Sequence, residues 1–220
     1  MTLLTSLTST TEFKPHWNNV NTRIIRSEEC AAAFDRMFWA FLFFLDFRLG
    51  VNNVHVDVLP DFIGWLMIAS ALTSILELTP KMHGIRTLAY WLVFLSLFDM
   101  VEIRIPFMKS GNFTGYISPT FPLGIIATIL DLLLIWKLCG VIIEMATAVG
   151  DDVIHERADF RRRIYLIFAI CLSLSVLVSF VIPPIAIVAV IIGLPVGLVM
   201  FCLMMGLMKG TANLCREASL

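Results

Sequence analysis

The chain has 220 residues, of which 59% are hydrophobic and 15% are charged, and its mean hydropathy is +0.88. This apolar share is higher than that of ordinary soluble domains and is typical of a membrane protein. The net charge of −1 offers no basic field for nucleic acid, so a nucleic-acid-binding function is excluded.

The N-terminal end is polar and differs from the rest of the chain. Residues 1–19 are rich in Ser and Thr, contain Pro15, and lack the basic start and apolar stretch of a signal peptide. We predict a flexible cytoplasmic tail over residues 1–19, a transmembrane helical bundle over 20–210, and a cytoplasmic tail over 211–220. Six spans of about 20 residues use most of the chain, which leaves no room for a separate soluble domain.

Six apolar stretches predict an all-α fold, a polytopic bundle of about six transmembrane helices. Their approximate ranges are 31–49, 62–78, 85–101, 122–149, 164–182 and 185–208. The first stretch has a short apolar centre with charged residues at both ends, so whether 31–49 crosses fully is left open. The segments between the stretches are expected to be loops, with the main cytoplasmic loop after Gly150.

Positive charge is distributed unevenly among the loops. Twelve of the sixteen Lys and Arg residues fall on one side of the predicted fold, in the segments between the spans or at a span end: Lys14, Arg23, Arg26, Arg36, Lys81, Arg86, Arg157, Arg161, Arg162, Arg163, Lys209 and Arg216. Because basic residues in short loops mark the cytoplasmic side, this pattern predicts six crossings with both termini in the cytoplasm.

A polar cluster is expected at the outer face, between the first two stretches. Its members are Asp46, Arg48, His55, Asp57 and Asp61. His55 and Asp57 alternate as in an extended segment, so their side chains would point the same way, and His with carboxylates can bind a divalent ion. The other interpretations are an ion pair of Arg48 with Asp46 or Asp61, with Asp61 capping the second helix, or a substrate-entry site.

A second group of ionisable residues is expected at membrane depth. Its members are Asp99, Glu102, Asp131, Lys137 and Glu144. Charged residues inside a membrane are costly and are functional candidates by default. Lys137 should face the bundle interior, with Asp99, Glu102 or Asp131 as its partner, and it shares a helical face with Glu144 seven residues later. Three interpretations stay open: a buried ion pair that fixes helix register, a proton or ion pathway, and lipid-headgroup contact.

Two further patterns have structural explanations. The basic run Arg161, Arg162 and Arg163 is interpreted as a topology anchor that also attracts anionic lipid. The patterns Gly193-x-x-x-Gly197 and Gly206-x-x-x-Gly210 allow close approach of helices. The cysteines form no C-x-x-C pair and no known catalytic motif is present, so the sequence predicts neither a metal site nor a cofactor.

One segment resembles a known group of proteins. The stretch from Leu45 to Trp65 reads LDFRLGVNNVHVDVLPDFIGW. It is similar to a segment of small polytopic bacterial membrane proteins of unassigned function, which share an L-D-F-R helix end followed by L-P-D-F-I-G-[YW]. The resemblance covers about a tenth of the chain. It implies a bacterial inner membrane and a multi-pass bundle, and it implies no activity, ligand or catalytic residue.

The function predicted from the sequence is that of a non-enzymatic integral membrane protein acting through protein or lipid contacts. Membrane lipids, together with further copies of the chain or another membrane protein, are the expected partners. A small ion- or proton-coupled transporter or channel that uses the intramembrane charges is the first alternative. A membrane-embedded enzyme that acts on a lipid-like substrate at the outer cluster is the second.

Overall fold

The computed structural model describes residues 28–44, 48–51, 54–57, 60–99, 101–103, 105–110, 113–117, 121–179, 182 and 184–219. Within these ranges the chain forms six α-helices: α2 (Glu28–Ala40), α3 (Asp61–Ser74), α4 (Lys81–Asp99), α5 (Phe121–Val149), α6 (Asp152–Ser179) and α7 (Pro184–Ser219). Two short 3-10 helices, η1 (Phe41–Phe44) and η2 (Leu76–Leu78), follow α2 and α3. The predicted helical bundle is confirmed.

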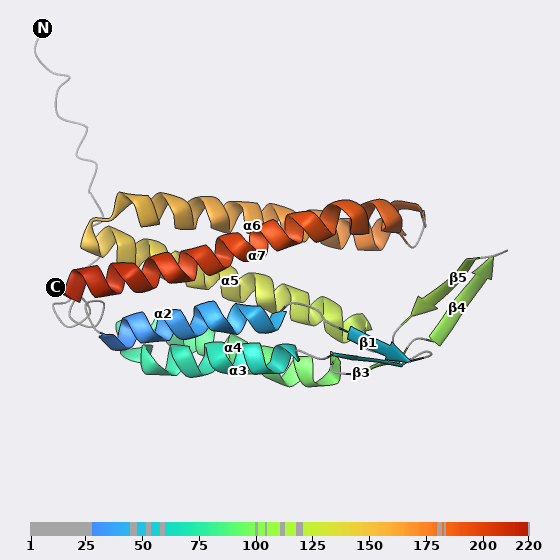
Figure 1. Ribbon diagram of the computed structural model, residues 1–220, viewed down its shortest axis with the longest axis horizontal. Coiled ribbons are helices and arrows are strands. Elements are labelled where there is room, and N and C mark those ends of the chain that lie inside the picture. Colours follow the sequence, from blue (N-terminus) through green and yellow to red (C-terminus); the bar gives the residue numbers. More distant parts are fainter. Residues whose placement is uncertain are drawn as a thin grey trace, which may run out of the picture.

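The six helices form a closed ring. Consecutive helices run in alternate directions along the bundle, and each packs against the helix before it and the helix after it in the chain (Figure 1). The ring closes because α2, the first of these helices, also packs along α7, the last.

Specific polar contacts join α2 to α7. The carboxylate of Asp35 accepts a hydrogen bond from Lys209 Nζ at 2.9 Å and a second one from the guanidinium of Arg216. The Sγ atoms of Cys30 and Cys215 lie 3.0 Å apart in a buried position. Asp35 is one of the charged residues near the ends of the first predicted stretch, and its charge is neutralised by these two cations of α7.

Short strands lie at the end of the bundle opposite Ser219 (Figure 1). They are β1 (Arg48–Val51), β2 (Val54–Asp57), β3 (Val101–Ile103), β4 (Ile105–Ser110) and β5 (Phe113–Ile117). Strands β1, β2 and β3 form one antiparallel sheet, and β4 pairs with β5 in a separate hairpin. The sequence analysis predicts these segments as loops, so the strands are an addition to the predicted fold.

The tightly packed core occupies the end of the bundle that contains Ser219. Its largest fully buried side chains are Phe34, Met37, Ile68, Leu72, Ile75, Leu78, Met82, Ile85, Leu92, Leu134 and Ile135. These residues come from α2, the second half of α3 with η2, the first part of α4 and the middle of α5. The helices meet most closely there, and the half of the bundle nearer the strands contains few buried residues.

The outward surface nearer the strands is apolar. Among its large exposed side chains are Trp91, Phe94, Ile129, Ile167 and Ile191. Three helices in the described part of the chain are long and apolar enough to cross a membrane, namely α5, α6 and α7, and α3 is a shorter apolar helix. An apolar surface of this extent favours lipid over water, which supports a membrane protein.

Several predicted boundaries differ from those of the structure. Residues 152–163, predicted as a cytoplasmic loop, form the first three turns of α6, and residues 211–219, predicted as a tail, continue α7. Ala212 and Cys215 are fully buried there, because the final turns of α7 pack against α2. The first predicted stretch, 31–49, is divided between α2, η1 and the start of β1.

The glycines of α7 explain how closely that helix approaches α6. A Cβ atom added to each would meet a side chain of α6: Leu172 at Gly193, Phe168 at Gly197, Arg161 at Gly206 and Ile154 at Gly210. The distances run from 3.1 Å at Gly210 to 3.8 Å at Gly206. The two predicted small-residue patterns therefore serve helix packing inside the bundle.

Candidate ligand-binding cavity

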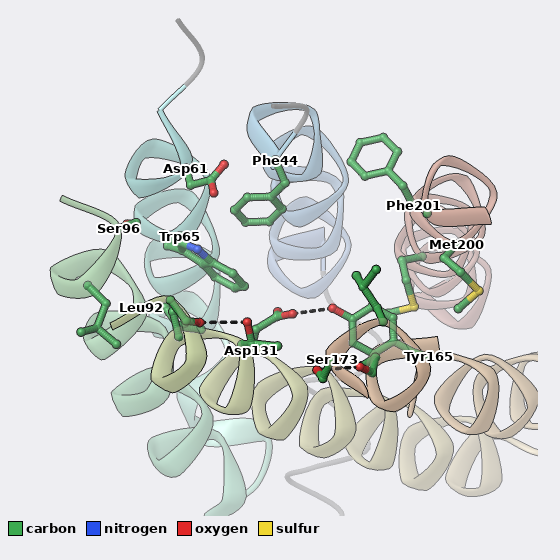
Figure 2. A pocket seen from close by; sticks show the side chains of 18 of the residues that line it. Phe44, Asp61, Trp65, Leu92, Ser96, Asp131, Tyr165, Ser173, Met200 and Phe201 are labelled. Atoms are coloured by element: carbon green, nitrogen blue, oxygen red, sulfur yellow. Dashed lines mark hydrogen bonds between the residues drawn. The ribbon is translucent and has the colours of Figure 1, made fainter. Parts of the chain in front are cut away.

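The helices of the ring line a partly open cavity of about 500 Å³. Helices α3 to α7 and the 3-10 helix η1, which continues α2, all contribute side chains to its wall. Examples are Phe44, Trp65, Leu92, Asp131, Tyr165 and Met200 (Figure 2). A volume of this size is typical of small-molecule sites in proteins. The cavity lies in the half of the bundle nearer the strands. The packed core borders it on the side away from the strands, and this side is called the floor of the cavity.

The order of the lining residues along the helices gives their depth. On α5 the lining runs from Leu123 at the strand end down to Asp131, and on α6 it runs from Ser173 down to Tyr165. Since these helices are antiparallel, Asp131 and Tyr165 both lie at the deep end, next to the core. Asp61, the first residue of α3, lies at the opposite end of the cavity, near the strands.

The principal polar group at the floor is a carboxylate. The hydroxyl of Tyr165 donates a hydrogen bond to Asp131 Oδ2, and the two side chains point toward each other across the α5–α6 interface (Figure 2). The other hydroxyls of the wall donate within their own helices: Ser96 to Val93 O, Thr128 to Gly124 O and Ser173 to Ala169 O. Asp131 is therefore the strongest acceptor available to a ligand at this depth.

Aromatic rings form one wall of the cavity. The rings of Phe44 and Trp65 have centroids 4.4 Å apart, and Phe41 meets Phe201 with centroids 6.1 Å apart. Gly64 allows this contact, because a Cβ there would lie 2.7 Å from Phe44 Cε1 and 2.9 Å from the backbone oxygen of Ala40. The glycine thus brings η1 against α3 and positions the aromatic wall.

The structure separates the predicted intramembrane charges. Asp131 lines the cavity, but the prediction that Lys137 faces the interior is wrong: its side chain is exposed, and a Cβ at Gly84 of α4 would lie 3.9 Å from its Nζ. Glu144 forms an ion pair with Lys81. The predicted common face of Lys137 and Glu144 is confirmed, and this face points toward the start of α4. Within the described part of the chain, none of the predicted carboxylates forms an ion pair with Lys137.

The other two members of that predicted group lie near the strands. Asp99 is the last residue of α4, and its side chain lies outside the described part. Glu102 belongs to strand β3 and not to the third helix, which corrects its predicted position. In the sheet Glu102 is the partner of His55 on β2.

The predicted outer cluster falls mainly on the three-stranded sheet. His55 and Asp57 are two residues apart on β2, as the predicted extended segment requires, and Arg48 on β1 is the register partner of Asp57. Asp46 lies outside the described residues, and the side chains of the strands are also outside the description. Asp61 is the first residue of α3, and the capping position before it is held by Pro60, so the predicted cap is corrected.

The described residues offer no cluster of metal ligands. Those residues contain no group of three or more His, Cys, Asp or Glu that could hold a metal ion. Asp151, His155 and Asp159, which follow one another at four-residue spacing, have separate roles: Asp151 caps α6 through Ile154 N–H, His155 contacts Thr147, and Asp159 pairs with Arg163.

Sequence reasoning missed most of the cavity. Tyr165 follows the basic run Arg161–Arg163 and has no motif that would link it to Asp131, which is 34 residues away. Trp65 and Phe44 looked like ordinary apolar residues of two different spans. The signal that could have indicated the site was Asp131 itself, a single carboxylate among the apolar residues of a long helix. Comparison of the chain with protein-family models, with curated proteins and with solved structures finds no match.

Proposed function

We propose that this chain is a non-enzymatic integral membrane protein that binds a lipid-like molecule inside its helix ring. The observation that supports this proposal is the cavity of about 500 Å³, with apolar and aromatic walls and the Asp131–Tyr165 pair at its floor. An apolar chain gains by leaving water for such walls, and one polar group of the ligand is fixed by hydrogen bonds. Because the floor offers a carboxylate, the polar group should be a donor, an amine or a hydroxyl.

Binding can be tested with a matched series of twelve-carbon probes. Brominated dodecylamine is expected to quench the fluorescence of Trp65 in the detergent-solubilised protein, and brominated dodecanoate to do so far less. Replacing Asp131 by Asn should weaken amine binding by about tenfold or more, since a hydrogen bond to a charged group contributes about 1.5–3 kcal/mol. The measurement is a fluorescence titration, with Trp65→Phe as the background from the other tryptophans.

Glu144→Gln is the matched control, because Glu144 is a carboxylate of the same helix that lies outside the cavity and pairs with Lys81. Its amine affinity should equal that of the unmodified protein. Equal quenching by amine and carboxylate probes, or equal losses in the two variants, would contradict the proposal. Proton-driven uptake of the probe into liposomes, lost in Asp131→Asn, would instead favour the transporter alternative, which the carboxyl–phenol contact also supports.

We also propose six crossings, with both termini in the cytoplasm of a bacterium and the strands outside its inner membrane. The alternating helices and the gathering of all described strands at one end support this arrangement (Figure 1). The basic residues of the described helices, such as Arg86, Arg157 and Lys209, belong to the other end.

Sidedness can be measured by cysteine labelling in cells, in a background from which the native cysteines are removed. A cysteine replacing Lys109 on β4 should react with a membrane-impermeant maleimide from outside. One replacing Arg157 on α6 should react only after the membrane is permeabilised. The reverse result, or labelling of both positions from one side, would exclude the proposed topology.

A further inference from the structure

Two adjacent arginines of α6 have buried hydrogen-bond donors that meet no partner among the described residues. Within the described structure, Arg161 Nη1 and Arg162 Nε are inaccessible to solvent and make no hydrogen bond. Both side chains are partly buried. A buried charged donor without an acceptor is costly, so these groups indicate an acceptor that the described residues do not supply.

Each guanidinium lies beside a glycine of a neighbouring helix. A Cβ at Gly206 of α7 would lie 3.8 Å from Arg161 Nη2, and a Cβ at Gly140 of α5 would lie 3.9 Å from Arg162 Nη1. The guanidinium of Arg162 also stacks on the ring of Trp136, 3.5 Å from its centroid. The two arginines are thus held between α5, α6 and α7 by small residues and by one aromatic ring.

Three carboxylates of α2, α5 and α6 bind other cations. Asp159 pairs with Arg163 at 2.7 Å, Glu144 with Lys81, and Asp35 with the cations of α7. Over the ranges that the structure describes, neither Arg161 nor Arg162 forms an ion pair with a carboxylate. Arg157, one turn before Arg161, is a further cation that has no acidic partner among the described residues.

We infer that Arg161 and Arg162 form a binding site for an anionic phosphate group, distinct from the cavity. A guanidinium presents paired N–H donors that match two phosphate oxygens, and a planar guanidinium can stack on an aromatic ring while it donates. The site lies one turn beyond Tyr165, on the side of the core. The phosphate group belongs either to a lipid headgroup or to a soluble phosphate, because both present the same oxygens.

A specific site at Arg161 and Arg162 predicts a different mutational pattern from that of a general basic surface. Arg163 is adjacent and carries the same charge, but its guanidinium is exposed and bound to Asp159. Arg161→Gln and Arg162→Gln should therefore each weaken phosphate binding by about tenfold, while Arg163→Gln leaves it unchanged, since only the first two lose donors of the site. Arg162→Lys keeps the positive charge but loses the paired N–H donors of the guanidinium. Its phosphate affinity should therefore resemble that of Arg162→Gln.

The experiment uses the full chain in nanodiscs and has two arms. In the first arm the nanodiscs contain phosphatidylcholine with 20% phosphatidylglycerol. In the second arm inorganic phosphate is the added ligand. Native mass spectrometry counts retained phosphatidylglycerol, and the fluorescence of Trp136 reports inorganic phosphate at constant ionic strength. Selective retention of phosphatidylglycerol alone assigns the site to a lipid headgroup, whereas a response to inorganic phosphate assigns it to a soluble anion.

Binding of neither probe by the unmodified protein would overturn the inference without any variant. An equal loss in Arg163→Gln would also overturn it, because the attraction would then be that of the basic run as a whole. A variant that fails to fold is recognised by its elution profile, and Arg162→Lys then provides the comparison.

Discussion

Replacing Phe34 by alanine is expected to destabilise the folded bundle more than any other single change considered for this chain. Phe34 is fully buried on α2, in the packed core at the end of the bundle that contains Ser219. Removing a buried phenylalanine costs about 3–5 kcal/mol, from lost contacts and from the space left behind. Inside a membrane protein such contacts matter particularly, because packing rather than exclusion from water holds helices together.

The measurement is the free energy of unfolding in mixed micelles, with the thermal midpoint as a second readout. Trp39→Ala is the matched control, since Trp39 is a larger aromatic residue on the same helix and is 56% exposed. We expect this control to change stability by less than about 1 kcal/mol, as surface substitutions do. Similar losses in both variants would show that α2 does not pack into the ring as the structure has it.

Replacing Gly64 by alanine is expected to have the next largest effect. In an exposed helix this change stabilises by about 1 kcal/mol, because alanine is the better helix former. At Gly64 the added methyl group would lie 2.9 Å from the backbone oxygen of Ala40, which cannot move without shifting α2. Overpacking of this kind costs about 1–3 kcal/mol, so the expected sign is opposite to that of helix propensity.

Gly84→Ala separates the two effects. Gly84 is exposed on α4, and the nearest atom to an added Cβ is Lys137 Nζ at 3.9 Å, the end of a flexible side chain. This variant should be as stable as the unmodified protein or slightly more so in the same unfolding measurement. If Gly64→Ala were also neutral or stabilising, the close approach of η1 to α3 would not exist. The Gly64 variant should also bind the amine probe less well, because the aromatic wall depends on that approach.

The helical bundle could be predicted from the sequence because long apolar stretches have few alternatives in a membrane. The extents of the helices could not, because α6 and α7 continue far into polar sequence. Residues 152–163 are charged, which suggested a loop, yet they form helix. Their apolar members Ile154 and Ala158 are four residues apart and buried on one face. The strands were missed because each is only three to six residues long.

The candidate site was predicted only in part, because depth along a helix does not give direction around it. Asp131 and Lys137 are six residues apart, which turns their side chains by about 240° on an α-helix. One therefore lines the cavity and the other reaches the outside beside α4. Glu144, seven residues from Lys137, returns to the same side. The partner of Asp131 depends on how α6 packs against α5, which no local pattern in the sequence encodes.

The contact between α2 and α7 has a consequence for biosynthesis. The partners Asp35 and Arg216 are separated by 181 positions, so every residue between them must leave the ribosome before they can meet. Until then α2 lacks its neighbour on one side, and its carboxylate has no counter-charge from that helix. The ring therefore closes only after α7 has been made, and contacts of such long range form slowly. Deleting the final turns of α7 should leave the earlier helices inserted in the membrane but without the α2–α7 contact that closes the ring.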